Sequence, residues 1–158
     1  MKNIVLTAVL AALIVGLPIS CVTCAPPTDK PTCDVQNAEA VAGLVDAAAG
    51  AAMPALGVLF PILIPAYATF HLALPLADTA LNSGLAEYEA GKTSSWSVLL
   101  AGLESLYQNF DKLWTTVTGK ASLVTAAKVQ VKARGASQVL SMLKTEKGKA
   151  ELFKAMHP

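Results

Sequence analysis

The spacing of large apolar residues between Ser95 and Gly119 constrains the fold more than any other feature of this chain. Apolar residues recur there at steps of four and three: Leu99, Leu103, Leu106, Phe110, Leu113 and Val117. Steps that average close to 3.6 residues place side chains on one face of an α-helix. Glu104, Asp111 and Lys112 occupy other positions of the same turns. The segment is therefore predicted to be an amphipathic helix that Gly119 ends.

The remaining sequence after Asn37 is rich in Ala, Leu and Val and is interrupted by helix-stopping residues. Gly43, Ala47, Ala51 and Ala55 recur every four residues, so one helix face carries almost no side chain and another helix can approach closely. Further helices are predicted over residues 39–53, over 66–90 with a kink at Pro75, and over 121–143, with a break between Pro54 and Pro65 and a last turn or two over 150–156. Residues 38–158 are thus predicted to form one small all-α bundle of about four helices.

The first 20 residues have the pattern of a signal peptide. Lys2 supplies a positive charge, residues 4–17 are apolar or small apart from Thr7, and Pro18 interrupts any helix. The apolar part is too short to cross a bilayer core of about 30 Å, which requires about 20 residues. We expect residues 1–20 to be cleaved after export.

Leu17, Pro18, Ile19, Ser20 and Cys21 resemble the lipobox of bacterial lipoproteins. Ser20 is the small residue that this family has before its cysteine, whereas Pro18 stands where the family usually has leucine. The resemblance implies that Cys21 is lipidated, becomes the new N-terminus and anchors the protein to a bacterial membrane, facing the periplasm or the cell exterior. Several acyl chains at about 0.8 kcal/mol per buried CH₂ anchor a protein firmly.

The cysteine count agrees with this interpretation, because an exported chain with three cysteines has one left over after pairing. If Cys21 carries the lipid, Cys24 and Cys33 remain to form a disulfide within residues 21–37, a Pro-rich tether. Closing a loop of about ten residues would contribute on the order of 2 to 3 kcal/mol. The alternative is that both are spare thiols.

Residues 47–77 contain no charged side chain apart from His71, when it is protonated. The segment is long enough to span a bilayer, but Pro54, Pro61, Pro65 and Pro75 argue against a simple membrane helix, because each removes a backbone donor. Two interpretations remain open: a buried core segment of a soluble bundle, or a segment that inserts in a membrane.

Charge is divided along the chain. Residues 21–111 hold two basic and nine acidic residues, and residues 112–158 hold nine basic and two acidic residues. One interpretation is that the basic C-terminal part packs against the acidic part. The other is that Lys128, Lys132 and Arg134 form a face for anionic lipid or an acidic partner protein. Nucleic acid is not expected, since no aromatic residues are interleaved with these lysines.

Catalytic and metal-binding patterns are largely missing from the sequence. Residues 86–93 match a loose phosphate-loop pattern, but one glycine and two carboxylates, Glu87 and Glu89, suit a helix end better than a phosphate site. There is no nucleophile elbow and no metal-binding helix motif. We therefore expect a protein that is not an enzyme and needs no cofactor or metal.

Five aromatic residues could either fill the core or line an apolar ligand cavity: Tyr67, Phe70, Trp96, Phe110 and Trp114. The main hypothesis for function is an exported, lipid-anchored helical interaction or structural module of the bacterial cell envelope, with an envelope protein as a further partner. The alternatives are a membrane-inserting protein, pore-forming or integral, that uses residues 47–77, and a small carrier of an apolar ligand.

Overall fold

The computed structural model describes residues 29–156, which form an all-α bundle, as predicted. The described part holds six helices rather than about four, because the C-terminal region is divided into shorter pieces. The helices are α2 (Lys30–Leu59), α3 (Leu63–Glu89), α4 (Trp96–Thr118), α5 (Leu123–Arg134), α6 (Ala136–Leu143) and α7 (Glu146–Met156).

Helix α2 begins nine residues before the predicted start at Glu39. The Asp29 carboxylate accepts a hydrogen bond from the Thr32 backbone amide at 3.4 Å, and Pro31 occupies the first turn, where a missing amide donor costs nothing. Cys33 and Val35 are buried. Residues 30–37, assigned from sequence to the tether, are therefore helical and packed against the bundle.

The break between α2 and α3 covers residues 60–62 alone, which corrects the predicted break between Pro54 and Pro65. Helix α2 continues past Pro54, because Leu56 in the following turn is buried and holds it in place. Pro65 lies in the first turn of α3, where its missing donor is not needed. Helix α3 also continues past Pro75, whose carbonyl accepts a hydrogen bond from the Thr79 hydroxyl at 2.7 Å.

Helix α4 confirms the amphipathic prediction, and Gly119 ends it in the left-handed conformation with φ of +65°. The predicted single helix over 121–143 is wrong: Gly135, with φ of +86°, separates α5 from α6. Helix α7 begins at Glu146, four residues before the last turn or two predicted over 150–156. Its first turn is capped by the Thr145 hydroxyl, which accepts from the Gly148 amide at 3.1 Å.

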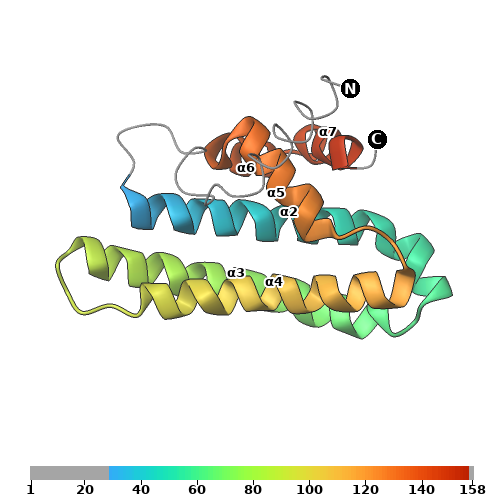
Figure 1. Cartoon of the computed structure of the whole chain (residues 1–158), viewed down its shortest axis with the longest axis horizontal. Coiled ribbons are helices and arrows are strands. Elements are labelled where there is room, and N and C mark those ends of the chain that lie inside the picture. The colour runs from blue at the N-terminus through green and yellow to red at the C-terminus, as the bar shows by residue number, and fades with distance from the viewer. Residues whose placement is uncertain (1–28, 157–158) are drawn as a thin grey trace, which may run out of the picture.

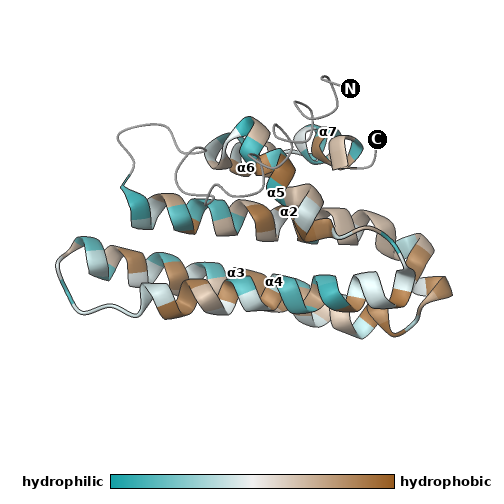
Figure 2. Ribbon diagram, viewed as in Figure 1, coloured by the Kyte–Doolittle hydropathy of each residue, from teal (hydrophilic) through white to brown (hydrophobic). Residues whose placement is uncertain are grey.

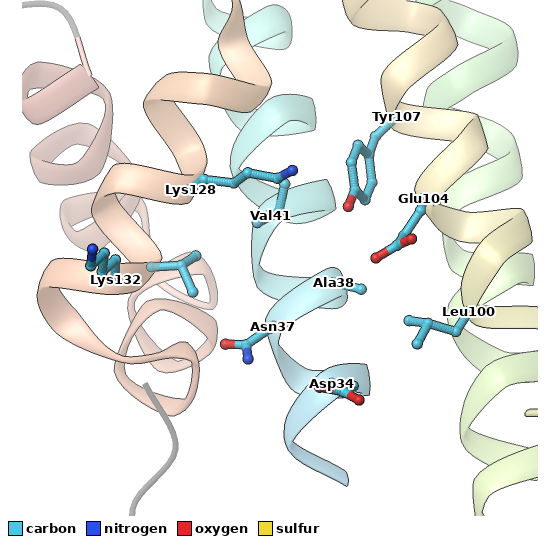
Figure 3. A pocket seen from close by; sticks show the side chains of 10 residues that line it. Asp34, Asn37, Ala38, Val41, Leu100, Glu104, Tyr107, Lys128 and Lys132 are labelled. Carbon is cyan, nitrogen blue, oxygen red and sulfur yellow. The ribbon is translucent and has the colours of Figure 1, made fainter. Parts of the chain in front are cut away.

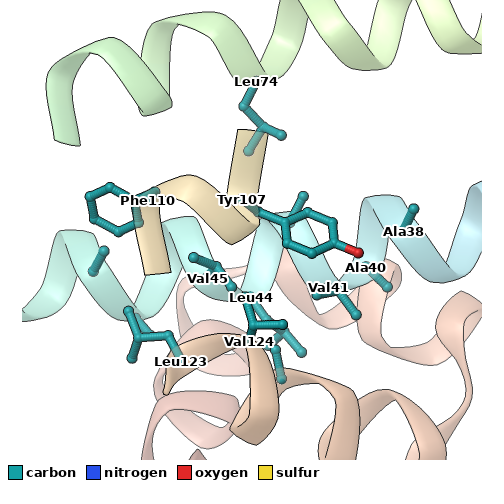
Figure 4. Packing of buried hydrophobic residues seen from close by; sticks show 14 of the residues in the cluster. Ala38, Ala40, Val41, Leu44, Val45, Leu74, Tyr107, Phe110, Leu123 and Val124 are labelled. Atoms are coloured by element: carbon teal, nitrogen blue, oxygen red, sulfur yellow. The ribbon is translucent and has the colours of Figure 1, made fainter. Parts of the chain in front are cut away.

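Helix α2 is the central element of the fold. It contacts each of the other five described helices, with the long pair α3 and α4 on one side and the short helices α5 to α7 on the other (Figure 1). Figure 4 shows Val41, Leu44 and Val45 of α2 between residues of α4 and α5. Because α2 is covered on several sides, most of its buried residues are small.

The predicted small-residue face of α2 is only partly used for close packing. A Cβ atom on Gly43 would lie 2.8 Å from Leu143 Cδ1 of α6, so α6 approaches α2 closely there. Further along the same face, Ala51 and Ala55 are exposed. This exposed part lies toward the α2–α3 turn.

Candidate functional site

The α2–α3 turn and the adjacent part of α3 carry a large exposed apolar surface, which we call the apolar end. Its large residues have exposed fractions of 54–80%: Val58, Leu59, Ile62, Ile64, Leu72 and Leu76. The hydropathy colouring marks this end of the molecule as strongly apolar (Figure 2). Monomeric soluble proteins rarely expose contiguous apolar patches of more than a few hundred Å², so this surface is a candidate contact site.

The exposed surface arises because α3 is apolar on two faces. One face, with Leu63, Phe70 and Leu74, is buried against α2 and α4. A second set of apolar residues, Ile64, Ala68, Leu72 and Leu76, recurs every four residues and is exposed. Residues four apart lie on one side of a helix. Helix α3 therefore presents a continuous apolar stripe that the described helices leave uncovered.

Asp46 of α2 and His71 of α3 form a polar contact away from the α2–α3 turn. His71 Nδ1 lies 2.8 Å from Asp46 Oδ1, and its ring stacks on Tyr67 at a centroid distance of 5.6 Å. Burial, followed by the charge of Asp46, raises the pKa of Tyr67 to about 12. From Asp46 to Leu59 the rise of α2 is about 20 Å at 1.5 Å per residue, and residues 47–59 hold no charged side chain.

Two lysines lie near the C-terminal end of α4, which reaches the same end of the molecule as the α2–α3 turn. Helix α4 runs back toward the α2–α3 turn, so its C-terminal part reaches the same end of the molecule (Figure 1). Lys112 in α4 and Lys120 just after it are exposed. Apolar side chains together with ammonium groups at one end of a molecule are complementary to a partner that has an apolar interior and an anionic surface.

Carboxylates gather toward the opposite end of the α2–α3 pair. The Asn82 amide donates to Glu39 Oε1 at 2.5 Å, and Asp78 lies near the same carboxylate. Burial, with Glu39 as the second cause, raises the pKa of Asp78 to about 6, and burial also raises that of Glu39. Asp78 Oδ1 is buried and has no hydrogen-bond partner. The acidic and apolar residues of these helices are thus separated along their length.

The predicted packing of the basic part of the chain (residues 112–158) against the acidic part (residues 21–111) involves no ion pair between the two parts within residues 29–156. The four ion pairs found there each join residues of one half: Lys30–Asp34, His71–Asp46, Arg134–Glu151 and Lys149–Glu146. The main polar link between the halves is made by Asp111, which accepts hydrogen bonds at the start of α5.

The proposed cationic face is divided by the fold. Arg134 contacts Glu151 at 3.1 Å and Gln130 at 3.2 Å. Lys128 and Lys132 are exposed and line a groove of about 310 Å³ between α2, α4 and α5 (Figure 3). The structure therefore brings two of the three residues together and assigns the third to a contact with α7.

Four of the five singled-out aromatic residues lie together as packed core. Phe70 and Phe110 stack with centroids 4.8 Å apart, Phe110 is 6.4 Å from Trp114, and Tyr67 is 6.1 Å from Phe110. Trp96 lies apart and contacts Tyr88 at 5.7 Å. None of the five lines the groove between α2, α4 and α5.

The groove itself was missed by sequence reasoning. Glu104 and Tyr107 come from α4, whereas Lys128 and Lys132 come from α5. Its floor is apolar, with Val41 and other small or aliphatic residues (Figure 3). No local sequence signal joins residues 24 positions apart, although the helical phase of Glu104 and Tyr107 does place them on neighbouring positions of one helix.

The remaining predictions concern the phosphate-loop pattern, metal binding and the N-terminal segment. The segment that matches the phosphate-loop pattern is the end of α3, a turn at Gly91 with φ of +71°, and the approach to α4. No group of three or more His, Cys, Asp or Glu residues within 29–156 is arranged to hold a metal ion. The signal peptide, Cys21 and Cys24 lie outside the described residues, so the lipid anchor and the pairing of Cys24 with the buried Cys33 stay predictions.

Comparisons with known proteins return no match to a family model, to a curated protein or to a solved structure. Of the described helices, α2 alone has the length and apolar composition of a membrane span. Because α2 contacts all the other helices, its apolar composition also suits the centre of a bundle.

Proposed function

We propose that this protein is an exported helical module of the bacterial cell envelope, held by a lipid on Cys21, that docks its apolar end onto a lipid bilayer. It performs no catalysis in this account. The single observation that carries the proposal is the exposed apolar end, with Val58 exposed to 80% and Leu59 to 69%. Such a surface is costly in water and is favoured where apolar material covers it.

The energetics favour a bilayer as the occupant. Each Val, Leu or Ile side chain that leaves water contributes about 1.5–3 kcal/mol, so partial burial of several supports measurable association. Lys112 and Lys120 lie near the end of α4 that reaches this end of the molecule, and each would add about 1 kcal/mol next to anionic headgroups. The absence of charged side chains from residues 47–59 of α2 allows the turn to enter the interface without burying a charge.

Peripheral docking accounts for the fold better than full insertion. Helix α2 is covered by α3 and α4 on one side and by α5 to α7 on the other, so inserting both helices of residues 47–77 would first require these contacts to separate. Docking through the turn leaves the core intact. Interfacial elements typically bury their apolar face about 5–10 Å into the boundary between headgroups and acyl chains.

The proposal is tested by flotation of the Cys21→Ser protein with vesicles of mixed zwitterionic and anionic lipid. The expected result is that this protein floats with the vesicles and that a variant with Leu59→Gln and Ile62→Gln does not. The matched control replaces Val98 and Val129, which are exposed to 70% and 58% outside the apolar end, by Gln and should float like the parent. Equal flotation of all three proteins, or of none, contradicts the proposal.

The lipid anchor is tested separately by the intact mass of the mature protein. Cleavage before Cys21 with the mass of attached acyl chains is the expected result. A mature N-terminus elsewhere, or Cys21 without acyl mass, contradicts the anchor and leaves the docking surface to be judged by the vesicle experiment alone.

A further inference from the structure

The groove between α2, α4 and α5 brings opposite charges to its two walls. Glu104 and Tyr107 project from α4, and Lys128 and Lys132 lie on α5, above a floor that includes Val41 and Val131. In Figure 3 the Glu104 carboxylate points toward α2 and the Lys128 ammonium group points toward the Tyr107 side. The volume of about 310 Å³ lies at the small end of the range for ligand pockets.

One polar side chain of this groove, that of Tyr107, is packed into the bundle. The Tyr107 side chain as a whole is only 2% exposed, and its hydroxyl points toward the Glu104 side of the groove (Figure 3). Burial, with the charge of Glu104 as a second cause, raises the pKa of Tyr107 well above its ordinary value. A hydroxyl oxygen that faces a groove can accept a hydrogen bond from a ligand group bound there.

The charges across the groove also do not neutralise one another. The ion pairs of the described residues include none of Glu104, Lys128 and Lys132. Asp34, at the groove's edge, is already paired with Lys30 at 2.5 Å. The two walls thus hold separate charges of opposite sign with an apolar surface between them, which is the arrangement that a ligand with two charged groups would complete.

We propose that this groove binds a small zwitterion with an apolar portion. Its ammonium group lies at Glu104 and donates to the Tyr107 hydroxyl oxygen, its anionic group lies at Lys128, and its apolar portion covers Val41 and Val131. A free apolar amino acid and a zwitterionic phospholipid both carry this chemistry. The site is separate from the apolar end and does not depend on bilayer docking.

The test is isothermal titration calorimetry of the Cys21→Ser protein with L-phenylalanine and with dihexanoyl phosphatidylethanolamine below its micelle concentration. At least one of the two is expected to bind, and the tighter one identifies the source. When phenylalanine binds, 2-phenylethylamine, which lacks the carboxylate, and 3-phenylpropionate, which lacks the ammonium group, should bind at least about ten-fold more weakly. When the phospholipid binds, dihexanoyl phosphatidic acid, which lacks the ammonium group, is the corresponding analogue.

Variants then assign the binding to the groove. Glu104→Gln and Lys128→Gln should each weaken binding by about ten-fold, and Tyr107→Phe should weaken it at an unchanged melting temperature. Glu87→Gln and Lys154→Gln remove exposed charges outside the groove and should bind like the parent. The proposal is overturned if neither zwitterion binds at millimolar concentration, if the single-charge analogues bind as tightly, or if the groove variants bind like the controls.

Discussion

The backbone amide of Leu123 donates a hydrogen bond of 2.7 Å to the Asp111 carboxylate, which joins the first turn of α5 to α4. The same carboxylate accepts from the Ser122 hydroxyl at 2.7 Å and from the Val124 amide at 3.3 Å. Amides at a helix start lack partners within the helix, so Asp111 satisfies groups that would otherwise be unpaired. This contact fixes where the basic C-terminal helices begin on the bundle.

Asp111→Ala should lower the free energy of unfolding by about 1–2 kcal/mol, because it leaves the start of α5 without its acceptor. Urea unfolding followed by circular dichroism gives the value. Gln108→Ala on an exposed position of the same helix is the control and should change stability by less than about 0.5 kcal/mol. Equal stability of the two variants would show that the Asp111 contact contributes little.

Gly148→Ala should lower stability by about 1–3 kcal/mol, since the added Cβ would collide with the backbone carbonyl of Met142 at the close approach of α6 to α7. Gly102→Ala is the matched substitution, because nothing lies within 4 Å of its Cβ position in the middle of α4. It should raise stability by up to about 1 kcal/mol. Thermal unfolding of both proteins checks the opposite signs, and a stabilising Gly148→Ala would refute the close approach.

Asp78 should make the protein more stable in mild acid. Its pKa is raised to about 6 in the folded state, by burial first and by Glu39 second, from an ordinary value of 3.8. The folded state therefore binds the proton more tightly, and the free energy of unfolding falls as pH rises through the window from about 4 to 6. Above that window the cost of holding the ionised carboxylate in the bundle is fully present.

Asp78→Asn should remove this contribution, so that the variant gains stability relative to the parent as pH rises from 4 to 7. Urea titrations at pH 4, 5, 6 and 7 measure the difference. A constant difference between variant and parent across these pH values would rule out the raised pKa of Asp78.

Phe110→Ala should lower stability by about 3–5 kcal/mol, because Phe110 is buried and contacts the rings of Phe70, Tyr67 and Trp114. Trp96→Ala removes an aromatic residue that is only partly buried and stands outside this group, so its effect should be smaller. Chemical unfolding separates the two. A larger loss for Trp96→Ala would contradict the position of the core between α3 and α4.

The sequence predicts a helix best when the helix has one apolar face and one polar face. Helix α4 has one apolar and one polar side, so its limits and its buried residues Leu103 and Phe110 follow from spacing. Helix α2 is surrounded by other helices, and its small residues show no strong periodicity. The predicted start at Glu39 is therefore nine residues later than the observed start at Lys30. The division at Gly135 depends on a backbone angle that spacing does not reveal.

The candidate surfaces were predictable to different degrees. The absence of charge over residues 47–77 is visible in the sequence and identified the region of the apolar end. That a second apolar face of α3 would stay exposed was not visible, since the buried residue Leu63 and the exposed residue Ile64 are chemically alike. The groove joins Glu104 to Lys128 through tertiary packing and could not be found from local patterns.

The most direct test of bilayer docking is the environment of a fluorescent label at position 62. Ile62→Cys and, as control, Ser137→Cys are labelled with an environment-sensitive dye in a background without Cys21, Cys24 and Cys33, after circular dichroism has shown that the fold is kept. Ser137 is exposed on α6. On addition of vesicles the label at position 62 should shift to shorter wavelength and be quenched by lipid-borne quenchers, and the label at position 137 should not. An unchanged spectrum at position 62, or the same shift at both positions, would contradict docking through the apolar end.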